Sequence, residues 1–204
     1  MTPLRDGPWL DVPLGARCRT LGWCLNAPGF GEADTVHWRE VRDADLGVGL
    51  DVAAWLAAEM AAAGRRGPCF LTSRAIGRFE RRTDGPAAVV ATVGLGNAER
   101  IGAPMRDGPG TVNVLARLDA PLSEGALVEA LSLVAEARTA AVMEHGPDAR
   151  GGRATGTGTD CILVAAPPGA GRHAGKHTPL GTALGRAVYE AVAAGTRAWM
   201  EEFG

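Results

Sequence analysis

Apolar and polar residues alternate along much of the chain, and this alternation predicts a protein rich in β-strands. Successive side chains of a strand point to opposite faces of a sheet, so a half-buried strand has a period of two residues. The segment at 87–95 is apolar almost throughout, which is typical of a central strand buried on both faces. The predicted strands cover residues 17–25, 33–41, 68–73, 78–83, 87–95, 111–119 and 161–165.

Three further segments have the period and the boundary signals of helices. Each begins at a residue whose side-chain oxygen can cap free backbone N–H groups. The first two end at glycines, which are favoured just beyond a helix. The predicted helices run from Asp51 to Gly64, from Ser123 to Gly146, and from Thr178 through Trp199.

These elements predict an α+β or mixed α/β fold, in which a mixed sheet is packed by about three helices. A length of 204 residues suits a single domain. Residues 1–14 are expected to form a flexible N-terminal arm, and residues 15–204 the domain itself. A right-handed crossover through the second helix would place the strand at Cys161 beside or near the strand at Thr111.

The overall composition narrows the functional classes. A net charge of −2 gives no electrostatic footprint for nucleic acid and no polybasic patch for a membrane. The chain begins without the pattern of a signal peptide, and no apolar stretch reaches the length of a transmembrane helix. Four cysteines without a C-x-x-C pair indicate reduced thiols. We therefore expect a cytoplasmic protein. The composition leaves open whether it forms a homo-oligomer.

An arginine within the apolar face of the second helix is the first candidate for chemistry. A guanidinium keeps its proton, so on a buried face it needs a carboxylate, carbonyl groups, or an anionic or amide-rich ligand. Arg138 falls in the middle of the face, Glu136 points the opposite way, and Asp160 is the nearest carboxylate in the predicted topology. A structural ion pair and a ligand contact both fit this position. The apolar face is formed by Leu127, Leu131, Val134, Ala135, Ala141 and Val142.

A threonine- and glycine-rich segment directly precedes the last predicted strand. Thr155, Thr157 and Thr159 alternate with glycines and are followed by Asp160. Backbone N–H groups in such a segment can form a concave anion-binding site, to which hydroxyl groups add donors and acceptors. The alternative is a flexible connection into the strand. No Gly-Lys-Ser/Thr follows, which counts against a phosphate-binding P-loop.

Two asparagines and three histidines complete the candidates. Asn97 follows the strand at 87–95 and Asn113 lies in the next strand, so their amides could converge at one sheet edge. His173 and His177 have a spacing that could bind a divalent metal on a helix, but they lie in a glycine-rich loop without a nearby third ligand. His37, between two apolar residues of a strand, is expected to be structural. No G-x-S-x-G or H-E-x-x-H signature is present.

Four segments, in this order and spacing, resemble the adenosylcobinamide amidohydrolase family of corrinoid salvage. They are GLGNAERIG at 94–102, GTVNVLARLDAPLSEGALVEALSLVAEARTAAVMEHG at 110–146, ATGTGTDCILVA at 154–165 and AGKHTPLG at 174–181. One departure is that the family helix commonly reads E-A-K-T, whereas this chain has Arg138. Because arginine cannot accept a proton, this position is expected to orient groups or to pair with charge.

The resemblance implies hydrolysis of the amide that joins the aminopropanol arm to the corrin ring of adenosylcobinamide. The corrinoid is the substrate, and no cofactor is implied. Whether a divalent metal takes part in the reaction is left open. Three sources of the nucleophile are considered: water activated by Asp160 or His177, a threonine such as Thr157, or a hydroxide on a metal bound by His177 and Asp160. The expected substrate-binding residues are Asn97, Asn113, Thr155, Thr159, Arg138 and Lys176.

Two other functions compete with this interpretation. A non-catalytic corrinoid-binding protein of the same fold is favoured by the arginine at position 138. A nucleotide-binding enzyme could use the threonine-glycine segment for phosphate, but the missing Lys-Ser/Thr counts against it.

Overall fold

The computed structural model describes residues 1–42, 45–47, 49–103 and 108–204. Its main element is an eight-stranded mixed sheet with the order β4-β3-β2-β12-β8-β6-β5 and β1 paired to β2. These strands are β1 (Leu4–Asp6), β2 (Trp9–Cys24), β3 (Ala27–Glu40), β4 (Cys69–Thr72), β5 (Glu80–Asp84), β6 (Ala87–Val93), β8 (Val112–Leu118) and β12 (Cys161–Ala166).

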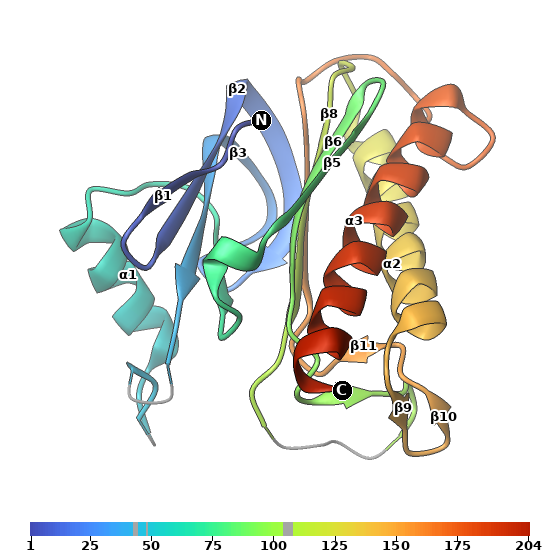
Figure 1. Cartoon of the computed structure of the whole chain (residues 1–204). Helices are drawn as coiled ribbons and strands as arrows, with labels where there is room; N and C mark the ends of the chain where they lie inside the picture. The colour runs from blue at the N-terminus through green and yellow to red at the C-terminus, as the bar shows by residue number, and fades with distance from the viewer. Residues whose placement is uncertain (43–44, 48, 104–107) are drawn as a thin grey trace.

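Three α-helices lie in the described part of the chain, as predicted, and the α+β class is confirmed. They are α1 (Val52–Ala62), α2 (Glu124–His145) and α3 (Pro179–Phe203). The expected caps are present, because Asp51, Ser123 and Thr178 each accept hydrogen bonds from backbone N–H groups of the first turn. Helices α2 and α3 lie side by side on one face of the sheet, and α1 lies on the other side (Figure 1). Among the described helices, none has both the length and the apolar character to cross a bilayer.

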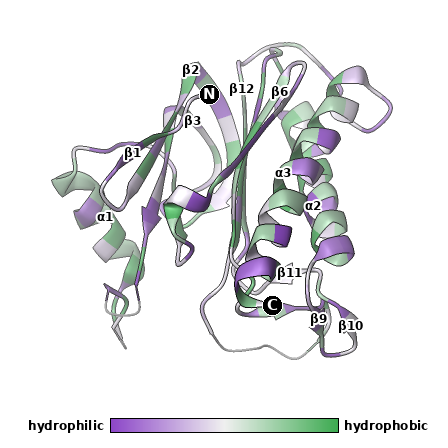
Figure 2. Cartoon of the chain, viewed as in Figure 1, coloured by the Kyte–Doolittle hydropathy of each residue, from purple (hydrophilic) through white to green (hydrophobic). Residues whose placement is uncertain are grey.

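The central strands separate two hydrophobic cores. In β8, Val112, Val114, Ala116 and Leu118 face α2 and α3, whereas Leu115 faces the second core with Val36, Trp38 and Leu163. This alternation follows the predicted period of two. Figure 2 shows the hydrophobic colour concentrated along the central strands. The predicted placement of the two strands beside each other is also confirmed, since β12 pairs in parallel with β8 and Cys161 lies opposite Asn113.

The sheet curls around the second core, so strands that are not neighbours come into contact. Asn113 Nδ2 of β8 donates to the Leu71 carbonyl oxygen of β4 at 2.8 Å. Trp38 Nε1 of β3 donates to Thr92 Oγ1 of β6 at 3.2 Å. These buried bonds close the curled sheet across its concave side and bring β4 next to the beginning of β8.

The N-terminal residues differ from the predicted flexible arm. Within 1–14, β1 pairs with β2, and Leu10 and Val12 are fully buried. Pro13 interrupts the sequence pattern but lies where the β2–β3 register shifts, and such an irregularity tolerates a proline. The loop expected at 26–32 is also shorter, because β3 already begins at Ala27.

A charged network fixes the first strands to the end of α1. His37 is 5% exposed, and its ring nitrogens lie 2.7 Å from Asp11 Oδ1 and 2.9 Å from the Arg66 carbonyl oxygen. Arg65 donates to both carboxylate oxygens of Asp11, each at 2.9 Å. Burial by itself raises the pKa of Asp11, but the hydrogen bonds from Arg65 and His37 outweigh it and lower that pKa. His37 therefore has the structural contacts that the sequence predicted.

Asp11→Asn is expected to lower the free energy of unfolding by about 1–3 kcal/mol near neutral pH, because hydrogen bonds to charged groups contribute about that much. The folded-state pKa of Asp11 lies below the ordinary 3.8, so its ionised form stabilises the fold above that pH. This contribution is lost as the pH falls through the folded-state value. Urea unfolding should show a wild-type advantage that shrinks in acid, while the exposed Asp34→Asn control shows none. A pH-independent difference would contradict the account.

Candidate active site at the start of two parallel strands

The candidate site lies where β8 and β12 begin side by side. Two short strands bring the remaining segments to the same place. Strand β11 (Gly156–Thr157) pairs with β7 (Ala98–Glu99), which joins the threonine-glycine segment to the loop after β6. A hairpin of β9 (Asp148–Ala149) and β10 (Gly152–Arg153) precedes this segment. The segment containing Asn97, the strand containing Asn113 and the threonine-glycine segment thus meet at one end of the sheet; the sequence led us to expect this only of Asn97 and Asn113.

The Asp160 carboxylate is the central acceptor of this edge. Its side chain is only 6% exposed. Oδ1 accepts from the Val112 backbone N–H at 2.9 Å and from the Thr157 hydroxyl at 2.5 Å. Oδ2 accepts from the Thr157 backbone N–H at 3.1 Å and from the Arg138 guanidinium. Four hydrogen bonds therefore hold this carboxylate between α2, β8 and the threonine-glycine segment.

Arg138 makes the pairing that its position on the apolar helix face predicted. Its side chain is 15% exposed, and Nη1 also lies 3.4 Å from the Thr155 carbonyl oxygen. Its Nε is buried and has no hydrogen-bond partner among the described residues. A Cβ at Gly156 would overlap both Arg138 and Asp160, so the ion pair requires glycine there. This explains one of the alternating glycines.

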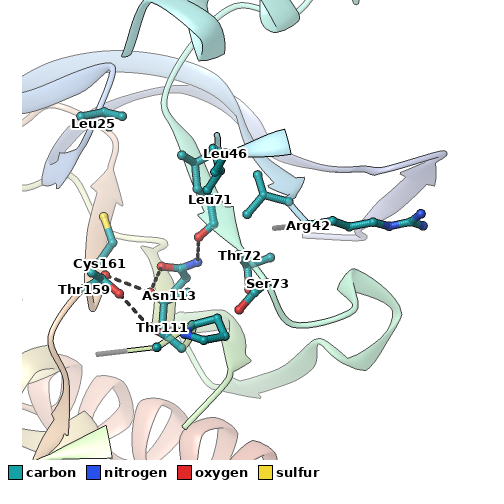
Figure 3. A pocket seen from close by; sticks show the side chains of 14 residues that line it. Leu25, Arg42, Leu46, Leu71, Thr72, Ser73, Thr111, Asn113, Thr159 and Cys161 are labelled. Atoms are coloured by element: carbon teal, nitrogen blue, oxygen red, sulfur yellow. Dashed lines mark hydrogen bonds between the residues drawn. The ribbon is translucent and has the colours of Figure 1, made fainter. Parts of the chain in front are cut away.

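A cavity of about 420 Å³ lies against the same strand beginnings, on the side of the second core (Figure 3). The cavity and the Arg138–Asp160 ion pair lie on opposite faces of the sheet. Cys161 faces the cavity, whereas Asp160, the preceding residue, faces α2. Part of the wall is apolar and part carries hydroxyl, amide and thiol groups. The apolar lining includes Leu25, Val41, Leu46 and Leu71, and the polar lining includes Thr72, Ser73, Thr111, Asn113, Thr159 and Cys161.

The polar wall of the cavity is held in place by hydrogen bonds (Figure 3). Thr111 Oγ1 lies 2.9 Å from the Thr159 carbonyl oxygen and 3.1 Å from Asn113 Oδ1. Thr159 Oγ1 donates to the Gly110 carbonyl oxygen at 2.7 Å. Asn113 uses one of its two N–H donors for Leu71, and the other has no acceptor among the described residues. The amide and hydroxyl groups are thus oriented before any ligand arrives.

Asn97 lies beside this wall, whereas Thr155 lies away from it, in contact with Arg138 and with Glu99 of β7. Asn97 is 5% exposed, and its Oδ1 is buried without a partner among the described residues. A Cβ at Gly110 would overlap that oxygen, so glycine lets the two segments approach closely. Thr155 Oγ1 accepts from the Ile101 N–H at 2.9 Å, which ties the threonine-glycine segment to the loop after β7.

His177 and Lys176 lie elsewhere. They line a separate cavity of about 380 Å³, which also includes His173 and Glu136. Lys176 Nζ pairs with Glu136 Oε1 at 2.6 Å. Glu136 and Arg138 point about 200° apart around α2, since each residue turns the helix by about 100°. The structure therefore does not bring His177 or Lys176 to Asp160, and the considered metal pair of His177 and Asp160 is not formed.

Within the described ranges, no group of three or more His, Cys, Asp or Glu side chains is placed to hold a metal ion. The residues that sequence reasoning missed are Thr111, Ser73 and Cys161 in the cavity wall. The alternation of the strand at 111–119 was the available signal for the first of them, because Thr111 shares a face with Asn113.

Arg138→Leu is expected to lower the free energy of unfolding by about 3–5 kcal/mol, because it leaves the Asp160 carboxylate buried without its cation. Arg138→Lys keeps the charge and should retain more than half of that stability. The control is Arg17→Leu, which breaks the exposed pair with Glu32 and should change stability by less than about 1 kcal/mol. Equal losses in the two leucine variants, measured by denaturant unfolding, would show that the pair has no structural role.

Comparison with known families gives one match. The model of the family described as adenosylcobinamide amidohydrolase matches residues 4–203, which is nearly the whole chain. A search of curated protein sequences returned no match. The matched range includes every element of the candidate site and also β1, which agrees with an N-terminal segment that belongs to the domain. The chain belongs to the adenosylcobinamide amidohydrolase family.

Proposed function

We propose that this protein hydrolyses the amide between the aminopropanol arm and the corrin ring of adenosylcobinamide, giving adenosylcobyric acid and aminopropanol. The observation that carries the proposal is the family match over residues 4–203, within which lies a cavity walled by pre-oriented amide and hydroxyl groups. An unactivated amide resists water, so an enzyme that cleaves it has to position both the carbonyl group and a nucleophile.

We assign the cavity of about 420 Å³ to side arms of the corrinoid next to the scissile amide, because Thr157 and Asp160, the residues proposed to act on that amide, do not line the cavity. A volume of this order holds a small ligand group, whereas a whole adenosylated corrin is much larger and would extend from the mouth. Leu25 and Leu46 offer apolar surface to the hydrocarbon edge of the macrocycle. Asn113 and Thr159 offer hydrogen bonds to the acetamide arms that neighbour the scissile amide. The unpaired Oδ1 of Asn97 behind Gly110 is a further acceptor in reach of this wall.

For the nucleophile, the contacts favour the threonine alternative. Thr157 is half-buried, and its hydroxyl already donates to Asp160 Oδ1 at 2.5 Å. A hydroxyl hydrogen-bonded to a carboxylate, which is itself oriented by a third group, is the usual arrangement of an activated nucleophile and its base. In the proposed step, Thr157 Oγ1 attacks the carbonyl carbon and its proton passes to Asp160. The amine leaves with a proton, and water then hydrolyses the ester. Arg138 holds Asp160 in place.

The activity is tested by incubating the purified protein with adenosylcobinamide, with and without a chelator, and measuring adenosylcobyric acid by mass spectrometry. Product in both samples is expected, because the proposed nucleophile comes from side chains. Loss of product with chelator would instead indicate a metal. Stoichiometric corrinoid binding without product would favour the non-catalytic binding protein and contradict the proposal.

Thr157→Ala is expected to lower kcat by at least about a hundredfold, whereas Thr157→Ser, which keeps the hydroxyl, should retain a substantial part of the rate. Asp160→Asn should abolish turnover while corrinoid binding persists. Thr182→Ala, an exposed threonine on α3, is the matched control with unchanged kcat. If Thr157→Ala turns over at the wild-type rate, water rather than Thr157 is the nucleophile.

A further inference from the structure

Two cysteines stand opposite each other on neighbouring antiparallel strands. Strands β2 and β12 pair with Leu163 opposite Gly22, and continuing this register by two residues places Cys161 opposite Cys24. Directly opposed residues of antiparallel strands have Cα atoms about 4.5–5.5 Å apart, which lies within the range that disulfides span. The two sulfur atoms are 3.9 Å apart. A disulfide could therefore form by side-chain rotation, without displacement of the backbone.

The two thiols differ in their access to solvent. Cys161 is half-buried and lines the cavity of about 420 Å³, whereas Cys24 is fully buried behind it. The strands approach closely here, because a Cβ at Gly22 would overlap the Ile162 carbonyl oxygen. A reagent that enters the cavity thus reaches Cys161 first and finds Cys24 within reach of the modified sulfur.

We propose that Cys24 and Cys161 are a modification site that forms a reversible disulfide in the cavity wall in response to low-molecular-weight disulfides. The Cys161 thiolate attacks a disulfide such as oxidised glutathione, which releases one glutathione thiol and leaves a mixed disulfide on Cys161. Cys24 then gives its proton to the departing glutathione sulfur while its own sulfur attacks the Cys161 sulfur, which releases the second glutathione as a thiol. The protein is oxidised by two electrons, and one glutathione disulfide is reduced to two thiols.

The surroundings explain why this pair, and not the other cysteines, reacts. Cys18 and Cys69 are both buried away from solvent. Burial raises the pKa of Cys69 to about 12, and burial likewise raises the pKa of Cys18. The contact with Cys161, followed by burial, raises the pKa of Cys24, so Cys24 is protonated and does not make the first attack. Cys161 is left as the entry point.

Oxidation would change the cavity. A disulfide draws the two sulfur atoms from 3.9 Å to about 2.05 Å. It would fix the end of β2, which carries Leu25 at the cavity, to the beginning of β12. Cys161 is also the register partner of Asn113, so the bond forms beside the proposed amide-binding group. The disulfide itself is independent of the proposed function, while its effect on turnover rests on that function.

The test treats the reduced full chain with oxidised glutathione and maps disulfides in peptides by mass spectrometry. A single link between the Cys24 and Cys161 peptides is expected, with the loss of two hydrogen atoms and reversal by dithiothreitol. Cys24→Ser and Cys161→Ser should both lose the link, and Cys24→Ser should instead retain glutathione on Cys161. The controls Cys18→Ser and Cys69→Ser should form it as the wild type does.

A link that involves Cys18 or Cys69, or glutathione that stays on Cys161 in the wild type, would overturn the proposal. In the same samples, oxidised wild type is expected to release adenosylcobyric acid about tenfold more slowly than reduced wild type, and dithiothreitol should restore the rate. Equal rates in the oxidised and reduced forms would contradict the claim that the disulfide slows turnover by changing the cavity. Absence of product from every form, with the disulfide mapped, would instead reject the proposed function alone.

Discussion

The buried ion pair between Arg138 and Asp160 connects all parts of the candidate site. Arg138 comes from the apolar face of α2, and Asp160 immediately precedes β12 and bonds to the backbone of β8 and of the threonine-glycine segment. Buried ion pairs are costly to desolvate, so their net contribution to stability is small, but removal of one partner is expensive. The pair consequently acts as a constraint on geometry. The segment at 155–160 has this conformation because the carboxylate accepts four hydrogen bonds.

This constraint has consequences on the other face of the sheet. Because successive residues of a strand point in opposite directions, anchoring Asp160 towards α2 turns Thr159 and Cys161 towards the cavity. The curled sheet supplies the opposite wall through the bond from Asn113 to Leu71. One face thus holds the Arg138–Asp160 pair, and the other presents amide, hydroxyl and thiol groups to a cavity that Arg42 also lines.

Local signals in the sequence were sufficient to predict the helices and most strands. Helix caps, the glycines that end helices, and the alternation of apolar and polar residues each depend on only a few neighbouring residues. The pairing of Arg138 was also predictable, since a guanidinium on an apolar helix face requires a partner. The first strands were missed because Pro8 and Pro13 break the pattern, although Leu10 and Val12 preserve the period of two. The position of His177 could not be predicted, because it depends on how the loop before α3 packs against α2. The cavity depends on the curl of the sheet, which joins β4 to β8 over a long stretch of sequence.

The central claim is that a side arm of the corrinoid, next to the scissile amide, occupies the cavity beside Asn113 and Cys161. The most direct test is the rate at which iodoacetamide alkylates Cys161 in the reduced protein, measured by peptide mass spectrometry with and without saturating adenosylcobinamide. Since the other three cysteines are buried, Cys161 is the thiol that reacts. The account predicts that adenosylcobinamide slows this alkylation strongly, and that Asn113→Ala weakens the protection. An unchanged alkylation rate under conditions where corrinoid binding is independently observed would place the substrate elsewhere and contradict the account.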